Sequence, residues 1–199
     1  MKWIVIIIPS LFLIIPLQAD EWGPPETKDY YNKDSTYFIR ITPKNTPNKY
    51  WEWFTASSDN KQDFLPEDTI VTPCHAVLLK KTVTGDSIVW IKKLKNRVAP
   101  LHAMLSDDGK YFVTFDNWHS VGLGENVFVY YNENGEVLKS HILADISPFP
   151  IKDYQRTVSS VWWSCGRKFI DTKRIEICFM NRDKEQQKIV YNLEEQKIE

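Results

Sequence analysis

The sequence predicts an all-β domain of antiparallel, blade-like hairpins packed as a small sandwich or a partial propeller. Short apolar runs recur along the chain and are separated by turn residues, which is the pattern of consecutive strands. Aromatic residues make up 14% of the 199 residues, and aromatic side chains are enriched in strands. No long window shows apolar residues at the 3.6-residue spacing of a helix, so we expect little helix.

The N-terminus has the layout of a secretory signal peptide. Lys2 precedes an apolar run over residues 3–17, and the small residue Ala19 stands directly before an acidic pair. A cationic start, an apolar centre and a small residue at the exit are typical of a cleaved export signal. We therefore expect residues 1–19 to be removed and residues 20–199 to form a single β-rich domain, secreted or periplasmic. Two alternatives stay open, in which the segment is retained as a membrane anchor or is a buried element.

The first part of the mature chain is the least regular. Residues 20–35 are polar and rich in turn residues, so we expect an exposed lead-in there. Apolar and aromatic runs predict strands at 36–41 and 50–54. The polar stretch at 55–73 carries two prolines and predicts a long loop, of a length that is often functional.

From residue 74 onward the pattern becomes a regular series of hairpins. Gly and Asp in the intervening turns allow tight reversals of the chain, as at Asp108-Gly109 and Asn134-Gly135. One short helix is predicted over 143–147. The predicted strands of this part lie at 76–83, 87–94, 101–105, 110–116, 126–131, 136–143, 159–165, 174–180 and 188–193.

Two of these hairpins resemble blades of WD40-like β-propellers. Residues 105–114, Leu-Ser-Asp-Asp-Gly-Lys-Tyr-Phe-Val-Thr, are similar to the strand–S-x-D-G-K–strand unit of a blade, and residues 127–138 to the two strands that follow it. The resemblance covers residues 74–145, and the Gly-His and Trp-Asp dipeptides of true WD40 repeats do not occur. In layout the chain resembles uncharacterised small exported bacterial proteins with a propeller-blade-like core. That resemblance implies the fold and no catalytic residue.

Composition narrows the class of partner. The net charge is −1, so no broad basic surface is predicted and no nucleic acid is expected as a partner. Contact with a membrane is expected only if the N-terminal segment is retained. The four histidines are scattered, and no CxxC or HxxxH spacing occurs, so neither a metal site nor a cofactor is predicted.

The three cysteines predict one disulfide and one free thiol in an oxidising compartment. Cys165 and Cys178 lie on neighbouring predicted strands and can pair if the register allows it. Cys74 with Cys165 is the alternative pairing, and the spacing does not decide between the two.

The best candidate site is the loop that follows the strand at 110–116. It brings a carboxylate, an amide, an indole and an imidazole close together, and two glycines let a ligand approach the backbone. The alternative is a structural loop, in which the polar side chains cap turns and the indole covers a sheet edge. The residues predicted to bind a small polar ligand or a partner are Asp116, Asn117, Trp118, His119, Gly122 and Gly124.

No catalytic motif occurs, neither G-x-S-x-G nor a phosphate loop, so we predict a non-enzymatic exported domain that binds a protein or an envelope polymer. Aromatic clusters at 50–54 and at Trp162-Trp163 suggest a surface on which sugar rings stack, and the alternative is that these residues fill the core or cover a sheet edge. Because neighbouring strand residues face opposite sides, only one of Trp162 and Trp163 can point inward. The alternatives are a secreted hydrolase with its site near Asp116 and His119, and an anchored structural protein of the envelope.

Overall fold

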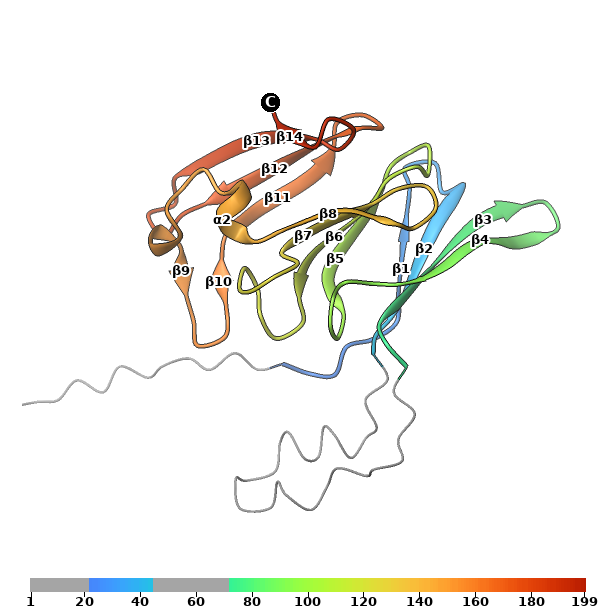
Figure 1. Ribbon diagram of the computed structural model, residues 1–199, viewed down its shortest axis with the longest axis horizontal. Coiled ribbons are helices and arrows are strands. Elements are labelled where there is room, and N and C mark those ends of the chain that lie inside the picture. Colours follow the sequence, from blue (N-terminus) through green and yellow to red (C-terminus); the bar gives the residue numbers. More distant parts are fainter. Residues whose placement is uncertain (1–21, 45–71) are drawn as a thin grey trace, which may run out of the picture.

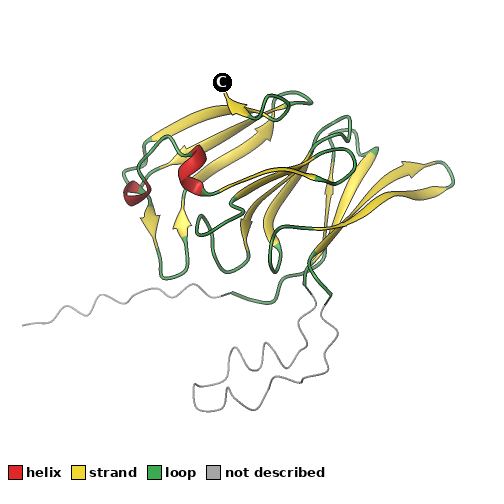
Figure 2. Ribbon diagram, in the orientation of Figure 1, coloured by secondary structure: helices red, strands yellow, loops and turns green. Residues whose placement is uncertain are grey.

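The computed structural model describes residues 22–44 and 72–199, which form an almost entirely β structure (Figure 2). Three four-stranded antiparallel sheets follow one another along the chain. Within each sheet the order of the strands matches their order in the sequence. In Figure 1 the three sheets lie side by side in sequence order, with the second sheet between the other two. The predicted all-β, antiparallel fold of consecutive hairpins is confirmed, and the arrangement fits a small sandwich or a partial propeller.

The first sheet begins in the segment that the sequence predicts to be an exposed lead-in, and that prediction is wrong for four residues. Residues Lys28–Tyr31 form a strand, held to its neighbour by a bidentate pair in which Arg40 Nε and Nη2 donate to the Asp29 carboxylate at 2.8 and 2.7 Å. The predicted strand at 50–54 and most of the predicted loop at 55–73 lie outside the described residues. The strands of this sheet are β1 (Lys28–Tyr31), β2 (Tyr37–Thr42), β3 (His75–Thr82) and β4 (Gly85–Lys93).

The second sheet lies between the other two and is the most deeply buried. All four residues of β7 and the first five of β6 are buried, because neighbouring side chains point to opposite faces and each face meets another sheet. A short helix follows the sheet, as predicted, at α2 (Leu143–Ile146). The strands are β5 (Pro100–Leu105), β6 (Phe112–Asn117), β7 (Phe128–Tyr131) and β8 (Val137–His141).

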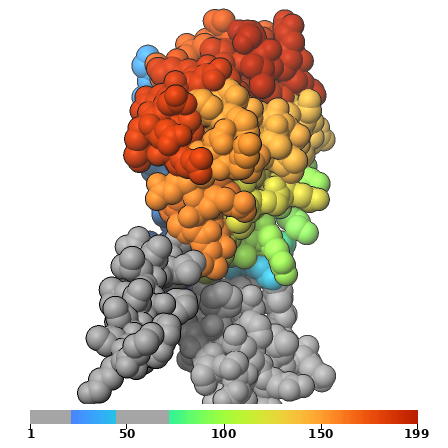
Figure 3. Space-filling view, turned by 90° about the vertical axis from the view of Figure 1, so that its left-hand side faces the viewer, coloured from blue at the N-terminus to red at the C-terminus, as the bar shows by residue number. Residues whose placement is uncertain are grey.

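The third sheet is preceded by a small two-stranded sheet. The strand predicted at 159–165 is divided, because the chain passes at Trp163 from one sheet to the next and Cys165 then forms a bulge opposite β12. The elements are η2 (Ile151–Asp153), the pair β9 (Gln155–Arg156) and β10 (Val161–Trp162), and the sheet of β11 (Ser164–Phe169), β12 (Arg174–Met180), β13 (Gln186–Asn192) and β14 (Lys197–Ile198). Figure 3 shows the β9–β10 region in orange beneath the C-terminal strands in red.

Two apolar clusters meet at the second sheet. Along β6, Val113 and Phe115 face the third sheet, whereas Phe112 faces the first. The cluster towards the third sheet includes Ile177 and Phe179 of β12, both fully buried. This alternation lets one sheet supply both interfaces.

The cysteines pair as one of the two predicted alternatives. Cys165 and Cys178 form a disulfide between β11 and β12, with their Cα atoms 5.1 Å apart. Cys74 is free and buried, and burial raises the pKa of its thiol to about 12. The thiol is therefore protonated and unreactive at neutral pH.

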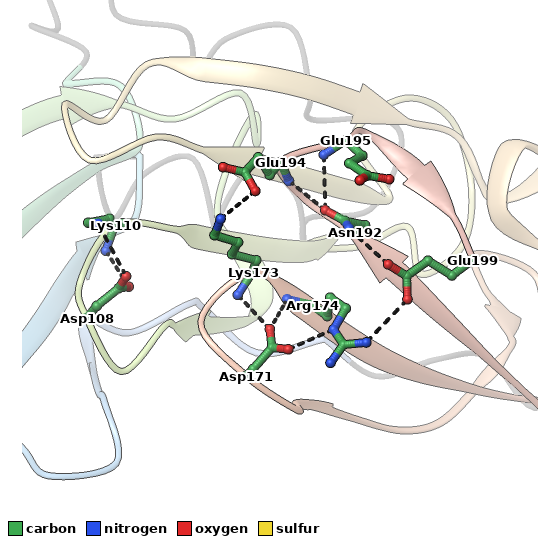
Figure 4. A network of polar contacts seen from close by, with 9 residues as sticks. All are labelled: Asp108, Lys110, Asp171, Lys173, Arg174, Asn192, Glu194, Glu195 and Glu199. Carbon is green, nitrogen blue, oxygen red and sulfur yellow. Dashed lines mark hydrogen bonds and ion pairs between the residues drawn. The ribbon is translucent and has the colours of Figure 1, made fainter.

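The end of the third sheet formed by the β11–β12 turn and the residues after β13 carries a network of exposed ion pairs (Figure 4). Asp171 accepts hydrogen bonds from the backbone N–H and the Nε of Arg174, at 2.8 and 2.7 Å, which fixes the β11–β12 turn. Arg174 also pairs with Glu199 at 3.5 Å, and Lys173 with Glu194. Because these groups are exposed and satisfy one another, they stabilise local geometry more than the whole fold. Within residues 22–44 and 72–199, no helix has the length and apolar character needed to cross a membrane.

Candidate functional site

Two adjoining pockets lie along the first strands of the three four-stranded sheets. The Tyr30 pocket, of about 520 Å³, is lined by β1, β5 and the end of β11, and includes Tyr30 and Phe169. The Arg167 pocket, of about 380 Å³, is lined by β5, the end of β6 and the segment from Trp162 to Arg167. His102 of β5 lines both pockets and is exposed. We refer to them together as the paired pockets.

Arg167 is the most unusual side chain in these walls. Its guanidinium carbon lies 4.4 Å from the centre of the Phe115 ring and 5.5 Å from that of the Trp163 ring, so the cation rests against two aromatic faces. Nη1 is enclosed and has no hydrogen-bond partner among the described residues. Burial lowers the pKa of Arg167 and the negative charge of Asp116 opposes this, but an arginine remains charged at neutral pH.

Asp116 forms the inner wall of the Arg167 pocket and is only 2% exposed. Its Oδ1 accepts hydrogen bonds from the indole N–H of Trp163 (2.9 Å) and from the backbone N–H of Gly122 (2.7 Å). Burial raises the pKa of Asp116 to about 6, against the opposing effects of the two donors and of Arg167. The carboxylate therefore ties the loop after β6 to the start of the third sheet.

The next three predicted residues pack against other segments. Asn117 accepts a hydrogen bond from Asn96 Nδ2 at 3.1 Å and donates one to the Glu125 carbonyl at 2.6 Å. The indole of Trp118 donates to the Gly23 carbonyl at 3.1 Å and meets the Trp22 ring edge-on at 5.5 Å. The His119 ring lies 5.3 Å from the Trp22 ring and does not line the Arg167 pocket.

The two glycines of the loop have different surroundings. Gly122 has φ +64°, and a Cβ there would come within 2.7 Å of the Val161 carbonyl oxygen and 2.8 Å of Trp163 Cδ1. Its lack of a side chain permits close packing of the loop against β10. Gly124 has φ +71° and no neighbour within 4 Å of the corresponding position, so only its backbone conformation favours glycine there.

Of the six predicted residues, Asp116 is therefore the one that lines the Arg167 pocket. Its hydrogen bonds to Gly122 and Trp163 make it a structural part of the pocket wall. Asn117, Trp118 and His119 lie where the loop meets Asn96 and the segment around Trp22. Their contact with a ligand or partner stays a prediction.

Reasoning from the sequence missed His102, Ser164 and Arg167. Arg167 pairs in register with the fully buried Ile177 of β12. The available signal is an arginine shortly after the pair Trp162-Trp163, but the bulge at Cys165 shifts the alternation and conceals which face Arg167 occupies. The prediction that only one of the tandem tryptophans points inward is confirmed, because Trp163 is 1% exposed and Trp162 49%.

Among the described residues, no group of three His, Cys, Asp or Glu side chains is placed to hold a metal ion. Neither a model of a known protein family nor a curated protein sequence matches this chain.

Proposed function

We propose that the chain is an exported, non-enzymatic domain that binds a protein or an envelope polymer at the paired pockets. The observation that carries the proposal is that His102 joins two pockets lined by the first strands of all three four-stranded sheets. An elongated partner laid along these strands contacts several rigid elements at once, so little ordering of the protein is needed on binding.

Two features support export to a secreted or periplasmic location. Residues 1–19 have the layout of a signal peptide. The disulfide between Cys165 and Cys178 is compatible with an oxidising compartment.

The burial of Asp116 favours binding over hydrolysis as the function of the Arg167 pocket. A general base or nucleophile needs a free oxygen within reach of the substrate. Asp116 is instead only 2% exposed, both of its donors bind Oδ1, and His119 lies outside the Arg167 pocket. The hydrolase alternative rests on the raised pKa of Asp116, which suits an acid.

The test uses chain 20–199 as bait against envelope extract of the source organism, with and without protease treatment of the extract. Retention of a partner after proteolysis assigns a polymer, and loss assigns a protein. His102→Ala removes an exposed pocket side chain without disturbing the core and is expected to weaken retention about tenfold. Lys197→Ala, on the exposed strand β14, is the control and is expected to bind as the unchanged chain does.

Equal retention by His102→Ala and the control contradicts the paired pockets as the binding face. Turnover of an envelope polymer that is lost in Asp116→Asn contradicts the non-enzymatic reading and supports the hydrolase instead.

A further inference from the structure

We propose that the Arg167 pocket is a subsite for a single carboxylate group, held by the guanidinium of Arg167. This inference rests on the proposed function, because it names the chemical group by which the partner is recognised. The subsite predicts a partner that carries carboxylates, such as an acidic peptide or a uronic-acid polymer.

The first argument is that no described residue accepts a hydrogen bond from Arg167. A guanidinium has five N–H donors, and none of those of Arg167 is used within the described residues. Nη1 is fully enclosed, as is Ser164 Oγ in the same pocket wall, so a ligand oxygen does not reach either atom. Nε and Nη2 are not enclosed in this way, and they are the donors that can meet a ligand oxygen in the pocket.

The second argument is preorganisation. The aromatic rings of Phe115 and Trp163 lie against the guanidinium at 4.4 and 5.5 Å and restrict its orientation. Little side-chain freedom is then lost when an anion binds. A planar guanidinium matches a planar carboxylate, to which it can donate two parallel hydrogen bonds.

The third argument is charge, which favours an anion. Asp116 acts on Arg167 through its charge, but no ion pair joins the two side chains among the described residues, and Oδ1 of Asp116 accepts hydrogen bonds from Trp163 and Gly122 instead. The negative charge of Asp116 therefore reduces the positive potential in the pocket without neutralising Arg167 in an ion pair.

The test is a titration of the folded chain with acetate, the simplest carboxylate, at constant ionic strength and pH 7. The side-chain Nε–Hε signal of Arg167 in ¹⁵N-labelled protein reports binding and is assigned by its loss in Arg167→Met. We expect a saturable shift with acetate.

Lys168→Met is the matched control, since it removes one positive charge from the adjacent, exposed position of β11. It is expected to leave acetate binding unchanged. If Arg167→Met does not fold, Arg167→Lys decides, because it keeps the charge but loses the planar fork and should bind acetate about tenfold more weakly. The subsite is overturned by a shift that does not saturate or by equal weakening in Lys168→Met.

The acetate titration needs no partner, so the two proposals fail separately. Saturable acetate binding without a retained envelope component supports the subsite and overturns the binding domain. If retention of an envelope component depends on His102 but acetate does not bind, the binding domain is supported and the carboxylate subsite is overturned.

Discussion

Asp116 shows how one residue can decide the conformation of a whole loop. Its backbone has φ +58°, and the loop continues with positive φ at His119, Gly122 and Gly124. The carboxylate accepts the Gly122 N–H inside this turn and the Trp163 N–H from outside it. Polar residues that the sequence presents as a ligand cluster are thus drawn into the protein's own hydrogen bonds.

The raised pKa of Asp116 predicts a pH-dependent contribution to stability. The carboxyl titrates near 3.9 in an unfolded chain and at about 6 in the folded protein. Between these values the folded state holds more protons than the unfolded state, so stability is lost as the pH rises. Asp116→Asn removes this loss. The difference in unfolding free energy between the variant and the unchanged chain should therefore shift by about 2 kcal/mol in favour of the variant between pH 4 and pH 7.5.

Urea unfolding of both proteins at the two pH values measures this difference. Glu133→Gln, at an exposed carboxyl, is the control and should follow the pH dependence of the unchanged chain. A constant offset between Asp116→Asn and the unchanged chain at both pH values would contradict the assignment.

The two loop glycines give a matched pair of substitutions. Gly122→Ala combines a strained backbone with a clash against Val161 and Trp163, and should lower the unfolding free energy by about 3 kcal/mol. Gly124→Ala has the same backbone strain and free space, and should cost about 1 kcal/mol. The shift in urea midpoint measures both. Similar losses in the two variants would show that contact with β10 is unimportant.

At the scale of elements, the disulfide predicts how many thiols can be labelled. Cys165 and Cys178 are bonded, and Cys74 is buried with its pKa raised to about 12. A thiol reagent at pH 8 should find no reactive group in the native protein, one after unfolding without reductant, and three after unfolding with reductant. A fast-reacting thiol in the native protein would disprove burial of Cys74.

The strands show which elements a sequence reveals. β12 lies where it was predicted, over Arg174–Met180, because its apolar residues alternate and its turns are marked. β1 was missed because Lys28–Tyr31 is polar and its stability comes from pairing with β2 and from Arg40, which no local pattern displays. β11 was placed too early because the bulge at Cys165 breaks the alternation.

The candidate site was less predictable than the fold, because its residues come together only through contacts between distant parts of the chain. Clustering in sequence marked the loop containing Asp116, whereas the paired pockets are assembled from β1, β5 and β11, which are far apart in the chain. Arg167 acquires its character from Phe115 and Trp163, and that contact exists only after folding.

For the whole molecule, the position of the second sheet predicts a gradient of local stability. β6 and β7 are buried on both faces, whereas β4 and β14 are edge strands with mostly exposed residues. Amide hydrogen exchange should be slowest over Val113–Phe115 and Phe128–Tyr131 and fastest in the edge strands. Equal protection of β4 and β7 would contradict the central role of this sheet.

A buried polar contact strengthens the junction of the second and third sheets. Tyr191 OH lies 2.8 Å from His141 Nε2 and 3.2 Å from Tyr130 OH, within hydrogen-bond distance of both. Tyr191→Phe removes both interactions and leaves two polar groups unpaired, so it should cost about 2 kcal/mol of unfolding free energy, measured by urea unfolding. A cost near zero would show that the junction depends on apolar packing alone.

The order of the strands has a consequence for how the protein is made. Each four-stranded sheet uses consecutive strands, so a chain delivered N-terminus first can complete one sheet before the next arrives. Each sheet still needs the next one to cover an apolar face, and the face of the second sheet towards Ile177 and Phe179 stays uncovered until the last quarter of the chain emerges. Nascent chains halted after β8 would therefore present an apolar surface, and that interval is when a chaperone is most needed.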